Sequence, residues 1–186
     1  MNRFQDYANR LSGAILTYDW DPVEQLTEEL FRCWEGGATV FLCGNGGSAA
    51  NAIHIANDLL YGIGAGKKPG MRVEALPSNQ AILTCLANDI SSDDIYSEQL
   101  HVKADSGDLL IALSGSGNSE NIVRALLAGR DKGMCTFAIL GYSGGRCLEI
   151  ADTSIHLPVD DMQLSEDFQL IVGHMCMQAL YERGLT

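Results

Sequence analysis

Short, wholly apolar runs alternate with longer helix-patterned segments between residues 39 and 158, and this alternation is the strongest constraint on the fold. Strands that are apolar on both faces are typical of a parallel sheet that helices cover on both sides. We therefore predict an α/β fold with right-handed crossover connections. The predicted strands are residues 39–43, 72–76, 108–113, 136–141 and 153–158.

Helix-patterned segments fill most of the remaining chain. Residues 1–36 are predicted to form two helices, of which the second has Asp21 as its N-cap, Pro22 in its first turn and Gly37 at its end. The other predicted helices are residues 48–61, 80–87, 93–102, 119–132, a short helix after residue 144, and 165–183; residues 88–89 are predicted to form a loop.

Composition narrows the class of protein. The 186 residues fit one domain with a single core. A formal net charge of -12 without a basic block argues against binding to nucleic acid or to a membrane surface, because both depend on positive charge. We expect no signal peptide and no membrane span. Six cysteines without CxxC spacing favour small core residues in a reducing cytoplasm over a disulfide framework or a metal site.

Two glycine-serine loops follow predicted strands, at the edge of a parallel sheet where ligands bind. They are GNGGS (residues 44–48) and SGSGNS (residues 114–119), and a third loop follows Leu140. Glycines let backbone N–H groups turn toward one point, the helix start adds partial positive charge, and serine hydroxyls add donors. The loops therefore predict a phosphate site that needs no lysine. The alternative is a serine-rich N-cap that only turns the chain.

Two segments predicted to be helical carry histidines and carboxylates at helical spacing. His54 and Asp58 are spaced i, i+4, and Glu166 and His174 are spaced i, i+8, so each pair shares roughly one helix face. Facing each other, the four groups would suit zinc or a similar divalent ion, or would transfer protons without metal. The alternative is that His54 and Asp58 lie on a solvated face. His101 is predicted on a helix surface and His156 in a strand.

Four stretches, GNGGSAANAIHIANDL, LANDISSDDIYS, LSGSGNSENIVRAL and EDFQLIVGHMCMQAL, resemble the sugar isomerase (SIS) domain, and more narrowly the phosphoheptose isomerases. The resemblance covers nearly the whole chain. It implies that residues 1–186 form a single SIS domain with a flavodoxin-like, five-stranded parallel sheet flanked by helices. It also implies a homotetramer with active sites at subunit interfaces and with the helical pair of residues 1–36 used in oligomer packing.

The resemblance also implies roles for individual residues. The zinc histidines of the family match His54 and His174. The SGSGNS loop would hold the phosphate of a phosphorylated sugar. The implied phosphate contacts are Ser114, Gly115, Ser116 and Ser119, and the other implied substrate contacts are Asn45, Gly46, Gly47, Ser48, Asn88 and Asp89.

Two positions depart from the family pattern. The family normally has glutamate where Asp58 stands, and aspartate shortens the reach of the carboxylate by about 1.5 Å. The family usually has glutamine where Glu166 stands, so this chain gains a charge there. The two changes can compensate each other. Asp58 or Glu166 is therefore the predicted catalytic base, His174 the partnering acid, and all four residues the predicted zinc ligands.

The implied reaction is aldose–ketose isomerisation of sedoheptulose 7-phosphate to D-glycero-D-manno-heptose 7-phosphate, which would feed heptose into surface polysaccharide. One alternative is a non-catalytic SIS regulator that binds a sugar phosphate or a partner protein, as the DnaA initiator-associating protein does. Another alternative is an isomerase for a different phosphosugar.

Overall fold

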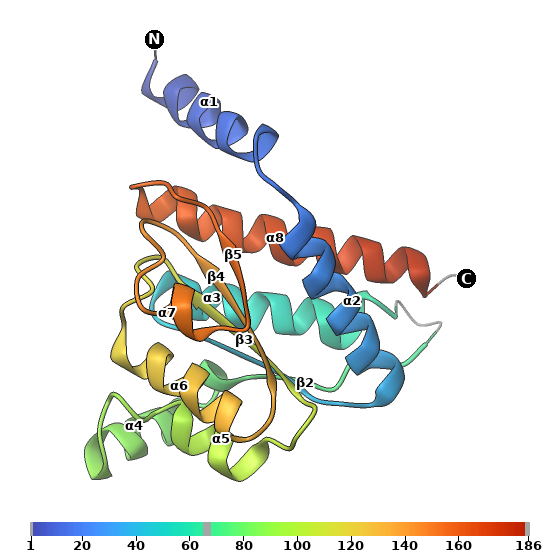
Figure 1. The fold of residues 1–186 in the computed structure, drawn as a ribbon, viewed down its shortest axis with the longest axis vertical. Helices are drawn as coiled ribbons and strands as arrows, with labels where there is room; N and C mark the ends of the chain where they lie inside the picture. Colours follow the sequence, from blue (N-terminus) through green and yellow to red (C-terminus); the bar gives the residue numbers. More distant parts are fainter. Residues whose placement is uncertain (1, 65–67, 185–186) are drawn as a thin grey trace.

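In the computed structural model, which describes residues 2–64 and 68–184, five strands form one parallel sheet in the order β2-β1-β3-β4-β5 (Figure 1). This is the flavodoxin-like order, so the predicted fold class is confirmed. The strands are β1 (Val40–Gly44), β2 (Val73–Ala75), β3 (Leu109–Ser114), β4 (Cys135–Leu140) and β5 (Thr153–His156).

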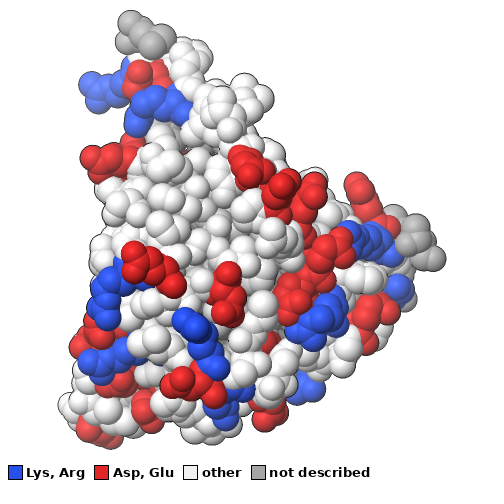
Figure 2. All heavy atoms as spheres, viewed as in Figure 1, with Lys and Arg blue, Asp and Glu red and all other residues white. Residues whose placement is uncertain are grey.

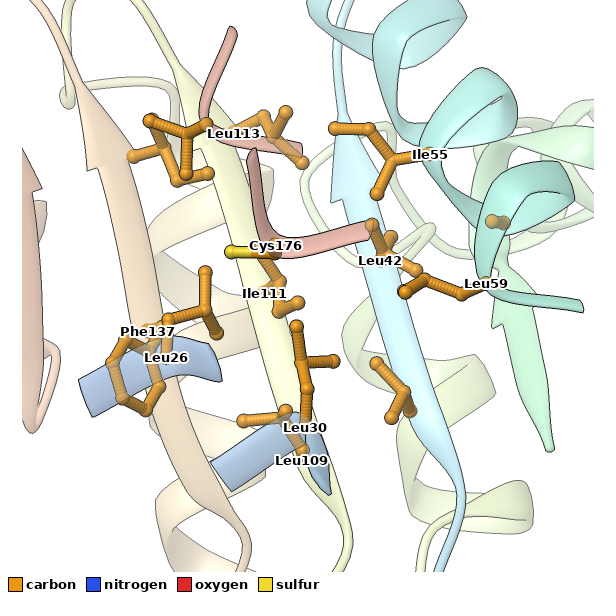
Figure 3. Packing of buried hydrophobic residues seen from close by; sticks show 14 of the residues in the cluster. Leu26, Leu30, Leu42, Ile55, Leu59, Leu109, Ile111, Leu113, Phe137 and Cys176 are labelled. Atoms are coloured by element: carbon orange, nitrogen blue, oxygen red, sulfur yellow. The ribbon is translucent and has the colours of Figure 1, made fainter. Parts of the chain in front are cut away.

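Helices cover both faces of the sheet. One face packs against α2 (Asp21–Gly36), α3 (Gly47–Asn57) and α8 (Met162–Arg183), and the other against α5 (Ser97–Lys103), α6 (Glu120–Asp131) and α7 (Cys147–Ile150). Figure 3 shows the first cluster, in which Leu30 of α2, Ile55 of α3 and Cys176 of α8 meet side chains of β1 and β3.

Alternate side chains of the central strands enter opposite cores. In β1, Leu42 packs into the cluster under α2, α3 and α8, whereas Phe41 and Cys43 pack into the cluster under α5 and α6. Every residue of β1 and β3 is buried. The fully apolar runs in the sequence therefore reflect a sheet that is covered twice.

The N-terminal helix pair forms as predicted, but its second helix begins differently. The N-cap of α2 is Trp20, and Asp21 is the first helical residue. The N-cap prediction is wrong by one residue because the carboxylate of Asp19 accepts the N–H of Asp21 (3.2 Å), so the helix begins at Asp21 itself. Gly37 ends α2 with a φ of 73°, as its lack of a side chain allows.

Helix α1 (Arg3–Leu16) projects from the body of the molecule and has no buried residue (Figure 1). Its polar side chains reach the start of α8. The Tyr7 hydroxyl donates to Asp167 (2.5 Å), and the Arg10 guanidinium donates to Asp161 (2.7 Å). Burial, together with the neighbouring Asp167 carboxylate, raises the pKa of Tyr7 to about 12.

The helix predicted over residues 48–61 changes character at Asp58. There α3 gives way to a π-helical turn, Asp58–Gly62, in which the Ile63 N–H donates to the Asp58 carbonyl (3.2 Å). A 3₁₀ turn, Leu76–Ser78, precedes α4 (Gln80–Asp89). The loop prediction for residues 88–89 is wrong because α4 continues through them, with the Ile90 N–H bonded to the Leu86 carbonyl.

Two other helices begin at different residues than predicted, and in each case a carboxylate near the helix start accounts for the difference. Helix α5 begins at Ser97 rather than near residue 93, and the Asp94 carboxylate instead binds Arg124 of α6 (2.7 Å). Helix α8 begins three residues earlier than predicted because the Asp161 carboxylate accepts the N–H groups of Gln163 and Leu164.

Charged side chains of both signs are mixed on the face that Figure 2 shows, and uncharged surface extends below α1. Acidic residues gather over α2, where Arg183 pairs with Glu28 and Arg32 pairs with Glu29. None of the helices in the described ranges has the length and apolarity required to cross a membrane.

The tight turn after β1 gives the first testable prediction. A Cβ on Gly44 would lie 2.6 Å from the backbone carbon and oxygen of Ser48. We therefore expect Gly44→Ala to lower the free energy of unfolding by about 3 kcal/mol, at the upper end of overpacking effects, in a urea titration.

Gly13→Ala is the matched control, because a Cβ at this position in α1 would meet nothing within 4 Å apart from its chain neighbours and the backbone of its own helix. It should leave stability unchanged or raise it by up to about 1 kcal/mol. Wild-type stability of Gly44→Ala would contradict the close approach of β1 to α3.

Candidate functional site

The two glycine-serine loops meet at the topological switch point of the sheet, where the connections that follow β1 and β3 lead to opposite sides. The strand order places β1 beside both β2 and β3, and the carboxyl ends of β1 and β3 are adjacent, with Gly44 paired to Leu113. The Tyr96 hydroxyl donates to the Gly44 carbonyl (2.5 Å), and burial raises the pKa of Tyr96. Ligands of open α/β sheets bind at this kind of switch point.

A cavity of about 250 Å³ opens between the two loops. It brings together the eight residues of these loops that the sequence predicted as ligand contacts, and adds three residues that were not predicted to line it. The eight are Asn45, Gly46, Gly47, Ser48, Ser114, Gly115, Ser116 and Ser119, and the other lining residues are Leu113, Met162 and Glu166, of which only Glu166 had been singled out, as a metal ligand or base.

Hydrogen bonds fix the first loop. The Asn45 side-chain amide exchanges two bonds with that of Asn121 in α6 (2.8 and 3.0 Å), so the loop after β1 is tied to the helix after β3. Gly46 is the N-cap of α3 with a φ of 56° and a ψ of -122°, a conformation that is accessible essentially to glycine alone.

The serines of the second loop have protons left to donate. The Ser114 hydroxyl oxygen accepts the Gly117 N–H (3.0 Å), and the Ser116 hydroxyl oxygen accepts the Asn118 N–H (3.3 Å). Each hydroxyl hydrogen can then point to an acceptor in the cavity. Ser119 is the N-cap of α6, whose first N–H groups have no partner within the helix.

The arginines near this loop are already paired. Arg146 and Arg124 both donate to Glu120, the first residue of α6, and these hydrogen bonds hold the pKa of Glu120 below its ordinary value. Among the described residues that line the cavity, none is lysine, arginine or histidine. An anion bound there would be held by N–H and O–H dipoles, as the sequence predicted.

A buried amide network joins α3 to α8 beneath the cavity. The Asn51 amide donates to the Glu166 carbonyl (2.9 Å) and to the Gln169 side chain (3.0 Å), which in turn donates to the Ser48 hydroxyl (3.0 Å). Sequence reasoning missed Asn51 and Gln169, because their role depends on the partner helix. The network places Glu166 against Gly47, where an added Cβ would overlap its carboxylate.

Three of the four predicted metal ligands converge farther along the same two helices. The Nε2 atoms of His54 and His174 lie 2.9 Å apart, and Asp58 Oδ2 lies 3.5 Å from the first and 3.6 Å from the second. The two histidine side chains are about half exposed and that of Asp58 is 20% exposed.

This donor set fits a divalent ion. Two imidazole nitrogens this close cannot face each other with both lone pairs free, so either a proton or a cation must lie between them. Two histidines and a carboxylate with an open fourth position are the ligands of many catalytic zinc sites. The other donors that zinc accepts would come from solvent or substrate.

The remaining predicted residues lie elsewhere. Glu166 does not join the His54, Asp58 and His174 group, because eight residues of helix separate it from His174 by about 12 Å along the axis. Asn88 and Asp89 are exposed at the end of α4 and do not line the cavity. His101 lies on the surface of α5 and His156 in β5, as predicted.

Comparison with known proteins places the chain in a family. The SIS domain profile matches residues 3–141. The phosphoheptose isomerase of Sulfurimonas denitrificans is 34% identical over 155 residues, which are 82% of this chain and 78% of the relative. The chain belongs to the phosphoheptose isomerase family. Another member, from Rhodospirillum rubrum, is 39% identical over 75% of this chain and 73% of its own length.

A solved structure shares the whole architecture. The phosphoheptose isomerase of Neisseria gonorrhoeae superimposes with a TM-score of 0.86, at 26% identity, over 96% of both chains. The family assignment and the fold therefore agree with the resemblance that the four sequence stretches carry.

The histidine cluster gives the second testable prediction. We expect His54→Ala to weaken zinc binding at least about 100-fold in a calorimetric titration, because even partners outside the ligand shell contribute 10- to 100-fold. His101→Ala is the control, since His101 lies near Glu98 (3.6 Å) on the surface of α5. Equal zinc affinity of His54→Ala and wild type would contradict the assignment.

Proposed function

We propose that this chain is an enzyme that interconverts sedoheptulose 7-phosphate and D-glycero-D-manno-heptose 7-phosphate by aldose–ketose isomerisation. Membership of the phosphoheptose isomerase family supports the reaction class. One observation carries the proposal: α3 and α8 connect two sites. At one end they border a cavity suited to a phosphate, and farther along they carry a cluster suited to proton transfer or metal binding.

The distance between these two places suits a long substrate. Gly47 and His54 are seven residues apart in α3, which corresponds to about 10 Å along the helix axis. An extended seven-carbon sugar phosphate spans roughly the same length, since each of its carbon–carbon bonds advances about 1.25 Å. A sugar whose phosphate lies at SGSGNS could therefore place its other end toward the cluster.

The reaction requires a base, an acid and stabilisation of an enediolate. Asp58 lies beside both imidazoles, so we assign it the transfer of a proton between C1 and C2 at the end of the sugar that lies toward the cluster. Glu166 lines the cavity between the two loops and is the alternative base. Without a metal, His174 would move the hydroxyl proton between O1 and O2. If His54, Asp58 and His174 held zinc, the ion would instead polarise the substrate oxygens.

Turnover tests the reaction directly. We expect wild-type protein to convert sedoheptulose 7-phosphate, followed by NMR, and we expect Asp58→Asn to lower kcat by about 10²-fold or more. Loss of activity in Glu166→Gln alone would make Glu166 the base. A chelator should abolish turnover if zinc takes part. Full activity of both variants would refute the assignment of the carboxylates.

The same assay separates the alternatives. Binding of the sugar phosphate without turnover would support a non-catalytic regulator. Turnover of a different sugar phosphate alone would support another isomerase. Within the proposal, the enzyme acts in the cytoplasm and its product feeds heptose into surface polysaccharide.

We also propose that the chain forms a homotetramer with active sites at subunit interfaces, and that the helices of residues 1–36 take part in packing. Large apolar side chains are exposed near the histidine cluster, on α3, the π-helical turn and α8, and α1 has no buried residue. Such apolar surface is typical of an interface. Asn88 and Asp89 would then contact substrate in a neighbouring subunit.

Light scattering tests the assembly. Leu60, in the π-helical turn beside the cluster, is 57% exposed, and we expect Leu60→Glu to reduce the molecular mass in solution because a charge would be buried in the interface. Leu127→Glu is the control, since Leu127 is 44% exposed on α6 at the other face of the sheet. A monomeric wild type, or an unchanged mass of Leu60→Glu, would contradict this interface.

A further inference from the structure

We propose that His156 is a positioning residue that keeps the SGSGNS loop in the shape that binds a phosphate, and that it acts through a strained turn at Tyr142. The inference rests on the phosphate site of the proposed function and concerns how that site is supported. It gives a role to the third loop at the ligand-binding edge of the sheet, which follows β4, and to a histidine outside the histidine cluster.

The third loop, residues 141–146, lies directly against the SGSGNS loop. The Gly141 N–H donates to the Gly115 carbonyl (3.0 Å), and the Cys147 N–H, just after the third loop, donates to the Gly117 carbonyl (2.9 Å). A Cβ on Gly117 would overlap the backbone of the third loop. Gly115 lines the cavity, whereas none of residues 141–146, all of which the structure describes, does so. The third loop can therefore affect a ligand only by shaping the SGSGNS loop.

Tyr142 is the strained residue of the third loop. Its φ is 43°, and it is the one residue other than glycine with a positive φ in the described ranges. A side chain disfavours this left-handed backbone, so neighbouring contacts must hold it. The peptide N–H immediately before it, that of Gly141, is the one that binds Gly115. If Tyr142 relaxed to an ordinary φ, this N–H would turn away from the SGSGNS loop.

The His156 side chain is one of the contacts that hold this turn. Its Nε2 lies 2.9 Å from the Tyr142 carbonyl oxygen. A carbonyl can only accept, so Nε2 carries the hydrogen and donates it. The Tyr142 N–H donates to the Val159 carbonyl (3.1 Å), so both backbone groups of Tyr142 bind the chain at the end of β5. Of these two bonds, only that of His156 comes from a side chain and can be removed by substitution.

Two amide substitutions separate this hydrogen bond from the bulk of the side chain. Glutamine places an amide N–H near the position of Nε2, whereas asparagine is one methylene shorter and does not reach the Tyr142 carbonyl. His156 is half-buried on the edge strand β5, a place where both polar side chains can be accommodated.

Inorganic phosphate is the probe, in a titration followed by phosphorus NMR, because it tests the loop apart from any sugar or reaction. We expect His156→Asn to weaken phosphate binding about tenfold, the order of one hydrogen bond. His156→Gln should keep the dissociation constant within about twofold of wild type, because the donor is retained.

A second background makes the test specific to the strained turn. Glycine adopts a positive φ readily, so Tyr142→Gly does not need the bond from His156 to keep its backbone conformation. In the Tyr142→Gly background we therefore expect His156→Asn to change the dissociation constant by less than about twofold. If His156 only stabilised the fold, His156→Asn would instead lower the free energy of unfolding without this dependence on residue 142.

The other outcomes overturn the inference in distinguishable ways. Equal phosphate affinity of wild type and His156→Asn would overturn the role of His156 and leave the phosphate site intact. Equal weakening by His156→Asn and His156→Gln, or by His156→Asn in both backgrounds, would show that the bond to the strained turn is not what matters, and would also overturn it. Failure of wild type to bind phosphate would overturn the phosphate site of the proposed function, and this inference with it.

Discussion

The contact between α3 and α8 is the interaction on which the rest of the site depends. These helices come from positions more than a hundred residues apart in the chain, and three side-chain amide bonds among Ser48, Asn51, Gln169 and the Glu166 carbonyl fix their register. One end of the pair completes the cavity and the other brings His54 and His174 together. A buried amide left without its partner would cost about 1–3 kcal/mol, so a shift of either helix is penalised.

The parts of the fold that could be predicted are those that local sequence determines. A wholly apolar run such as residues 109–113 indicates a doubly covered strand whatever its neighbours are, and two such strands place their loops at one edge. Spacing of i, i+4 likewise puts His54 and Asp58 on one helix face. For these reasons the sheet, the cavity loops and three members of the histidine cluster followed from the sequence.

The parts that could not be predicted depend on a partner that the local sequence does not contain. Asn51 and Gln169 look like ordinary polar helix residues until the opposite helix makes each the partner of the other. Glu166 and His174 share a face by periodicity, but periodicity ignores the rise along the helix, which separates them. Helix α5 starts late because Asp94 binds an arginine thirty residues away.

The two departures from the family pattern can now be weighed against each other. Although aspartate is shorter than the usual glutamate, Asp58 Oδ2 still lies within 3.6 Å of both imidazole nitrogens, so these three side chains form a cluster without Glu166. Glu166 is therefore not needed to restore the cluster, and its position at Gly47 directs its charge into the cavity instead. In a chain of net charge -12, a further anion in an anion site is costly unless it faces an uncharged part of the ligand. Glutamate at this position lies against Gly47, the first residue of α3, and the helix dipole there offsets part of that cost.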